Sequence, residues 1–126
     1  MDFLSAVRHT TAALAAGDDE AIQAAFALAC HPWSVLRRSD ITAWDLFAMD
    51  LLAAHDGLCP QPTLVVVTVD APSAQGSELI TAVADLVTAL AGRLDDIARD
   101  GHRDVARRLA YAVAAHQVQL AASHLR

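Results

Sequence analysis

Hydrophobic residues recur at intervals of three and four in five stretches of this chain, the spacing that places side chains on one face of an α-helix. The pattern predicts helices over roughly residues 2–16, 18–30, 39–56, 77–99 and from 102 to the C-terminus. Gly17 suits the end of the first helix because glycine accepts the left-handed backbone. Pro32 is expected to end the second helix, since the residue before a proline disfavours helical geometry. Residues 31–39 are then predicted to form a loop.

The clearest periodicity lies between residues 77 and 99. The apolar positions, which predict a buried stripe, are Leu79, Val83, Leu86, Val87, Leu90, Leu94 and Ile97. The polar positions, which predict the solvent side, are Thr81, Asp85, Thr88, Gly92, Asp96 and Arg99. Asp95 stands four residues before Arg99, a spacing at which helix side chains form ion pairs. We therefore expect an amphipathic helix that packs on the core.

Two other helical stretches have broad apolar surfaces. The third stretch has its stripe at Ile41, Trp44, Ala48, Leu51, Leu52 and His55, and this stripe is widened by Leu46, Phe47 and Met49. Because it is apolar nearly all round, we expect this helix to be the most buried of the five. The last stretch aligns Val105, Leu109, Val113, His116 and Leu120 on one apolar face, with His116 expected at the edge of the core.

A Val-rich segment, residues 63–69, interrupts the helical pattern between Pro62 and Pro72. Its β-branched residues favour a strand, and the alternative is a short helix capped by Thr63. No second strand of similar quality occurs in the sequence. An extended segment here would carry unpaired backbone groups, so we expect it to pair with another chain, most simply a second copy related by a two-fold axis.

Composition narrows the classes of function. The 126-residue chain is 55% hydrophobic with a net charge of −6, and its nine basic residues are all arginine. This acidic balance argues against nucleic-acid binding, and the absence of lysine and asparagine indicates a high-GC bacterial genome. No apolar stretch is long enough to span a membrane. With two scattered cysteines and no signal peptide, we expect a cytoplasmic protein.

Thiol and imidazole side chains offer candidate chemistry at Cys30, His31, His55 and Cys59. Four such groups are the ligands of zinc sites, but adjacent ligands point different ways and the paired spacing of zinc motifs is missing. Cys59 follows the end of a predicted helix, which disfavours a reactive thiolate. We therefore expect no metal and no cofactor, and no catalytic residue can be assigned.

A ligand pocket is the remaining candidate site. Its residues would be Trp33, Arg37, Trp44 and His55, whose indoles, guanidinium and imidazole suit a planar or anionic ligand. Trp44 and His55 lie eleven residues apart and so share one side of a helix. The alternative is that the tryptophans are core residues and the arginine is solvated.

Taken together, these patterns predict an all-α fold, a bundle of about five helices with one extended Val-rich segment (63–69), in a single domain covering residues 1–126. The expected function is protein–protein association as a homodimer. The expected interface residues are Leu64, Val65, Val66, Val67 and Val69. If association does not depend on them, the third helix is the next choice. The alternative function is a small-molecule-binding bundle or accessory enzyme with its pocket near Trp33, Trp44 and His55.

Overall fold

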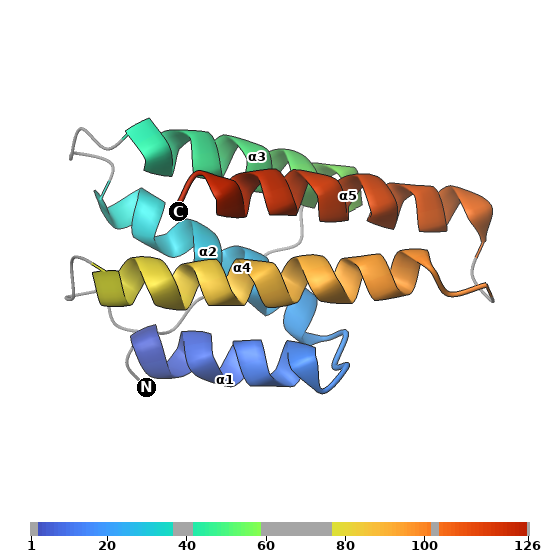
Figure 1. The fold of residues 1–126 in the computed structure, drawn as a ribbon, viewed down its shortest axis with the longest axis horizontal. Coiled ribbons are helices and arrows are strands. Elements are labelled where there is room, and N and C mark those ends of the chain that lie inside the picture. The colour runs from blue at the N-terminus through green and yellow to red at the C-terminus, as the bar shows by residue number, and fades with distance from the viewer. Residues whose placement is uncertain (1–2, 37–41, 59–76, 102–103, 126) are drawn as a thin grey trace.

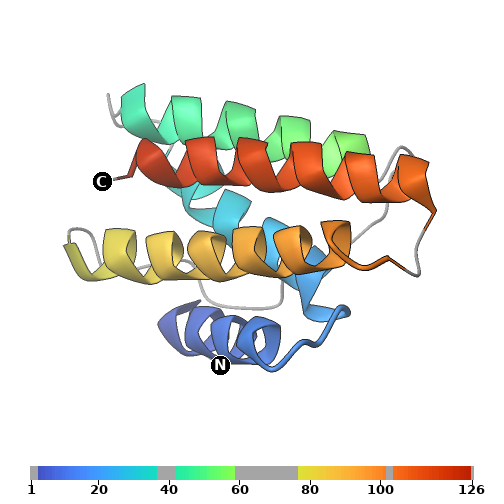
Figure 2. The ribbon, with the colours of Figure 1, turned by 45° about the vertical axis from the view of Figure 1, so that its right-hand side comes forward.

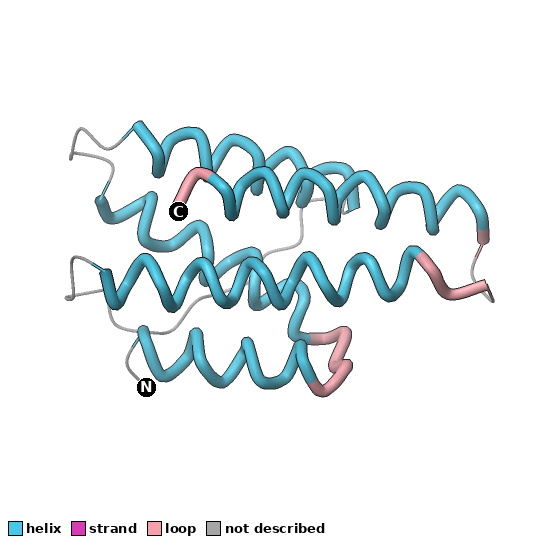
Figure 3. Tube along the Cα trace, in the orientation of Figure 1, coloured by secondary structure: helices cyan, strands magenta, loops and turns pink. Residues whose placement is uncertain are grey.

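The computed structural model describes residues 3–36, 42–58, 77–101 and 104–125, with the backbone alone for 30–36, 42–45 and 77–78. Five helices account for most of these residues, and no strand occurs among them (Figure 3). The helices are α1 (Phe3–Ala15), α2 (Ala21–Leu36), α3 (Thr42–Leu58), α4 (Ser77–Ala98) and α5 (Val105–Ser123). The predicted all-α bundle is confirmed. The Val-rich segment 63–69 lies outside the described residues.

Helix α4 occupies the centre of the bundle. It runs between α1 on one side and the pair α3 and α5 on the other, while α2 crosses behind it (Figures 1 and 2). Every apolar position predicted for this helix is buried and every polar position predicted for solvent is exposed. The Arg99 guanidinium lies 3.1 Å from the Asp95 carboxylate, as their spacing predicts. A single cluster of buried side chains draws on all five helices.

The turn between α1 and α2 is built around Gly17, whose φ is +87°. Its N–H donates to the Leu14 carbonyl at 3.0 Å, and the next N–H, of Asp18, donates to the Ala13 carbonyl at 3.0 Å. These two bonds are the Schellman arrangement that closes a helix end. Asp19 then accepts a 2.6 Å hydrogen bond from Arg93 Nε of α4, and this bond raises the pKa of the Arg93 guanidinium. The turn is thereby tied to the central helix.

Two predicted helix boundaries are wrong. Helix α2 continues through Pro32 to Leu36 instead of ending before the proline. A proline removes one helical donor, here the N–H that would bond to Leu28, and the alanine-rich sequence on its N-terminal side retains a high helix propensity. Helix α5 begins at Val105, not near residue 102, because Asp104 has the non-helical ψ of 140° that marks an N-cap.

Helix α3 is not the most buried helix. Phe47, Ala48, Leu51 and Ala54 form its core face, with Leu51 fully buried. The residues expected to widen the buried stripe are divided, because Phe47 lies inside while Leu46 and Met49 are exposed. Leu52, expected on the inner stripe, is also exposed. A single small bundle therefore covers only half of this apolar helix, and α4 is the helix with packed neighbours on most sides.

Candidate functional site

The large hydrophobic side chains that remain exposed within the described part of the chain all lie on two helices. We call them the α3–α5 face. Its members are Leu46, Met49 and Leu52 of α3 and Val105, Leu109, Val113 and Leu120 of α5, and each is between 40% and 72% exposed. Helices α3 and α5 pack side by side in both ribbon views (Figures 1 and 2). The seven side chains thus belong to two neighbouring helices. Asp50 of α3 contacts the end of α5, and Leu52, two residues further on, points away from α5.

Helix α5 has an inverted arrangement of side-chain sizes. Its buried residues are Ala114, Ala115, Val118, Ala121 and Ala122. Val118 is the one larger aliphatic residue among them, and Val105, Leu109, Val113 and Leu120 point outward. The predicted apolar stripe from Val105 to Leu120 is therefore the solvent side of the helix, not its core side. Alanines on the inner face allow α5 to approach α3 and α4 closely, so the core has no room for the leucines.

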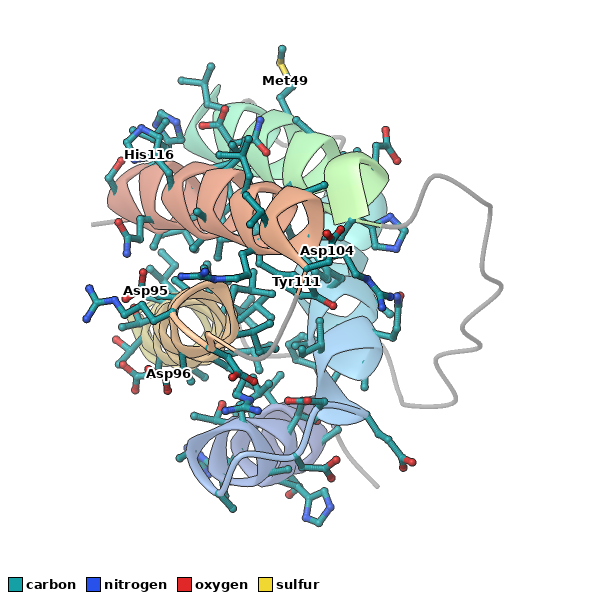
Figure 4. All side chains as sticks on the ribbon, turned by 90° about the vertical axis from the view of Figure 1, so that its right-hand side faces the viewer. Met49, Asp95, Asp96, Asp104, Tyr111 and His116 are labelled. Carbon is teal, nitrogen blue, oxygen red and sulfur yellow. The ribbon has the colours of Figure 1, made fainter. Side chains whose placement is uncertain are left out.

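His116 belongs to this outer stripe and is exposed rather than placed at the core edge. In Figure 4 it projects outward from α5, and Met49 projects outward from α3 in a different direction. Met49 is 67% exposed, although its unbranched thioether is a common core side chain. The exposed surface of the helix pair therefore carries an imidazole and a thioether in addition to its aliphatic residues.

The two helices are held antiparallel at one end by an ion pair. His124 Nε2, at the end of α5, lies 2.7 Å from Asp50 Oδ2 of α3, and both side chains are about one-third exposed. At the opposite end, Gly57 of α3 faces α5 across a shallow groove of about 310 Å³. The α5 residues that line this groove are Ala106, Leu109, Ala110, Val113, Ala114 and Gln117. The groove opens beside the α3–α5 face.

Charge is absent from the outer side of most of α5. Residues 109–123 contain no aspartate, glutamate, arginine or lysine. Arg107 precedes this neutral stretch and is exposed, whereas Arg108 Nε donates a 3.0 Å hydrogen bond to the Ala98 carbonyl at the end of α4. Arg99 is paired with Asp95. Arg99 and Arg108 thus have partners within the protein, whereas Arg107 is exposed.

The predicted ligand pocket is only partly described. His55 is half-buried, with Nε2 3.2 Å from Gln23 Oε1 and its ring centroid 5.2 Å from that of Phe26 in an edge-on arrangement. These contacts attach α3 to α2, and His55 Nδ1 also lies 3.8 Å from the exposed Asp56 carboxylate. Arg37 lies outside the described residues, as do the side chains of Trp33 and Trp44. The contacts of His55 indicate a structural role between α2 and α3.

Other predicted features also fall outside the description. These are the interface residues Leu64, Val65, Val66, Val67 and Val69, residue Cys59 and the side chains of Cys30 and His31. Within the described ranges, no three His, Cys, Asp or Glu side chains are grouped to hold a metal ion. None of the helices there combines the length and apolar content that a membrane span requires. Asp95 and Asp96 lie on the outer side of α4 (Figure 4).

Two further grooves occur between described helices. The larger, about 450 Å³, lies between α1 and α4 and is lined by Arg8, Thr11, Ala12, Ala15, Thr81, Ala82 and Asp85. The smaller, about 310 Å³, lies between α4 and α5 around Gly92 and Gln119. Both are shallow and lined mainly by alanine, threonine and glycine, and neither gathers the convergent buried polar groups of a ligand or active site.

Comparison with protein-family models, with curated proteins and with solved structures gives no match for this chain. We therefore infer its function from its own side chains. Among the described features, the α3–α5 face departs furthest from an ordinary protein surface, because all of the exposed large hydrophobic residues lie on two neighbouring helices.

Proposed function

We propose that this protein is a protein–protein association module that acts as a homodimer through the α3–α5 face. The observation that carries the proposal is the outward placement of seven large hydrophobic side chains, all on two adjacent helices. Single exposed leucines are common on protein surfaces, but the concentration of exposed apolar residues on two adjacent helices is typical of a site of association. The proposal rests on this face and not on the Val-rich segment 63–69, which lies outside the described residues.

The size of the α3–α5 face supports a stable contact. Its seven residues together expose the equivalent of about four complete side chains. At 25 cal/mol per Å², a side chain worth 1.5–3 kcal/mol corresponds to roughly 60–120 Å², so the face offers roughly 240–480 Å². A standard interface buries about 800 Å² per partner, of which about 60% is apolar. The face therefore supplies about half or more of the apolar part of such an interface.

The neutrality of the α5 part of the face favours a second copy as the partner. Two chains that each carry a net charge of −6 repel one another, and self-association needs a surface from which acidic residues are absent. Residues 109–123 of α5 satisfy this condition, whereas Asp50 lies between Met49 and Leu52 on α3. An isologous interface also uses the same patch twice, so one apolar face is sufficient, and no separate complementary surface has to exist.

The oligomeric state tests the proposal directly. Sedimentation velocity at high micromolar concentration is expected to give twice the protomer mass of 13.3 kDa. Leu109→Glu places a charge in the face and should give a protomer with an unchanged circular dichroism spectrum. Thr81→Glu adds the same charge at an exposed position of α4 and should remain dimeric. A wild-type protein that sediments as a monomer would refute the proposal.

A further inference from the structure

Four outward residues of α5 have the spacing of a coiled-coil seam. Leu109, Val113, His116 and Leu120 follow one another at intervals of four, three and four, and we call them the α5 seam. This alternation is the pattern with which one helix packs along another by inserting side chains into holes. Since Leu109, Val113 and Leu120 are exposed together with His116, the seam has no partner within the described part of its own chain.

The seam complements itself when a second copy runs in the opposite direction. In one antiparallel register, Leu109 lies opposite Leu120 of the second copy, and Val113 lies opposite His116 of the second copy. The two residue numbers of each pair have the same sum, so one register produces both pairs. The two-fold axis then repeats each pair with the roles of the two copies exchanged. The two leucine layers then enclose the two central layers of valine and histidine.

The groove beside Gly57 can receive a side chain of the second copy in this register. Among its lining residues are Ala106, Leu109, Ala110 and Val113. These four positions, at i, i+3, i+4 and i+7, are the set that forms one hole in knobs-into-holes packing. In the antiparallel register, Leu120 of the second copy lies opposite the centre of this hole.

The helix dipole distinguishes the antiparallel arrangement from a parallel one. Antiparallel α5 helices oppose their dipoles, whereas parallel helices align them. Ala110, Ala112, Gln117 and Gln119 flank the seam and carry no charge, so no charged side chain at these positions opposes the pairing.

We infer that two copies of the chain associate through an antiparallel α5–α5 contact, with Leu120 of each copy inserted into the hole formed by Ala106, Leu109, Ala110 and Val113 of the other. This inference rests on the proposed function and specifies its geometry. His116 is the polar residue of the seam. A polar residue at one seam position selects register at some cost in stability, and His116 is accordingly a specificity-determining residue of the contact.

Disulfide trapping tests the register. In a chain with Cys30 and Cys59 replaced by serine, Leu109→Cys combined with Leu120→Cys should form a covalent dimer under mild oxidation. The two new cysteines of one chain lie about 16 Å apart along the helix, too far for a bond within the chain. Each single variant should stay unlinked, because the register places identical residues far apart. Circular dichroism should show the same helix content in all variants.

The outcomes separate the register from the proposed function. A dimer that persists in sedimentation but is not trapped by the double variant would overturn the register alone, as would trapping of the Leu109→Cys single variant, which indicates parallel helices. A monomeric parent would overturn both proposals. Filling the hole gives a second measurement: Ala106→Trp, at an exposed position, should raise the dissociation constant by about tenfold or more. An unchanged constant would contradict the inserted Leu120.

Discussion

Shortening Leu109 should weaken association while leaving the protomer folded. Leu109 is 64% exposed, so roughly two-thirds of its side chain is available for burial in the dimer. Full burial of a leucine contributes about 1.5–3 kcal/mol. Leu109→Ala therefore removes about 1–2 kcal/mol per chain, or about 2–4 kcal/mol from a symmetric dimer. The dissociation constant should rise by roughly 30- to 900-fold.

The matched comparison is Leu90→Ala in the centre of α4. Leu90 is fully buried, and replacing such a leucine leaves a cavity that typically lowers the free energy of unfolding by about 2–5 kcal/mol. Leu109→Ala should lower the free energy of unfolding of the isolated protomer by less than about 0.5 kcal/mol, as is usual for surface positions. The same substitution chemistry thus has opposite consequences at the two sites.

Sedimentation equilibrium measures the dissociation constants, and urea denaturation measures the free energy of unfolding at a concentration where the protomer dominates. Dilution matters because dimerisation would otherwise add to the apparent stability. The interpretation would be refuted if Leu109→Ala unfolded as easily as Leu90→Ala while its dissociation constant stayed at the wild-type value. That result would mean that Leu109 stabilises the protomer and not the contact.

Four smaller perturbations test the turn, helix α4 and the seam. Gly17→Ala should lower the free energy of unfolding by about 1–2 kcal/mol, because φ is +87° there. Gly92→Ala, within α4 and facing open space, should raise it by about 0.5–1 kcal/mol. Asp19→Asn should cost at most about 1 kcal/mol in urea denaturation, since the ion pair with Arg93 is partly exposed. His116→Leu should tighten the dimer roughly tenfold in sedimentation equilibrium, and weaker association would contradict a seam position.

Helix α4 shows what periodicity predicts well. It has one long apolar stripe, which packs against the neighbouring helices. Every predicted position therefore lies on the expected side, buried or exposed. The Gly17 turn is equally local, because the left-handed φ is a property of one residue. Features that depend on a few neighbouring residues are therefore accessible from the sequence.

Helix α5 shows where periodicity stops. The spacing from Val105 to Leu120 groups residues on one face, as predicted, but spacing alone does not say whether that face is turned inward. A second stripe, from Ala114 to Ala122, shares the helix and is the one that the core accepts. Its alanines have a weak hydrophobic signal, and their value lies in close helix approach, which depends on α3 and α4. The sequence does contain one clue. A helix with a stripe of alanines and a second stripe of larger apolar residues has two faces that can pack against other helices.

The candidate ligand pocket was harder to predict from the sequence, for a different reason. The aromatic and cationic residue types around His55 suit either a ligand or a helix contact, and only distances separate these uses. His55 contacts Gln23 and Phe26 across the α2–α3 boundary, a long-range pairing that no local pattern contains. The continuation of α2 past Pro32 is a separate case, because the proline removes one helical donor while the alanine-rich residues before it keep a high helix propensity.

The division of α5 into an alanine side and a leucine side also links folding to association. Alanine contributes little apolar area, so the inner face of α5 adds less to the protomer core than the leucine-rich face of α4 does. The larger side chains gain stabilisation only when another surface covers them. If that surface is a second α5, the helix is packed on both sides, and its docking on the protomer and the dimer contact support one another. The core has no room for these leucines, and their outward placement, with large apolar side chains left in water, is the physical argument for a partner.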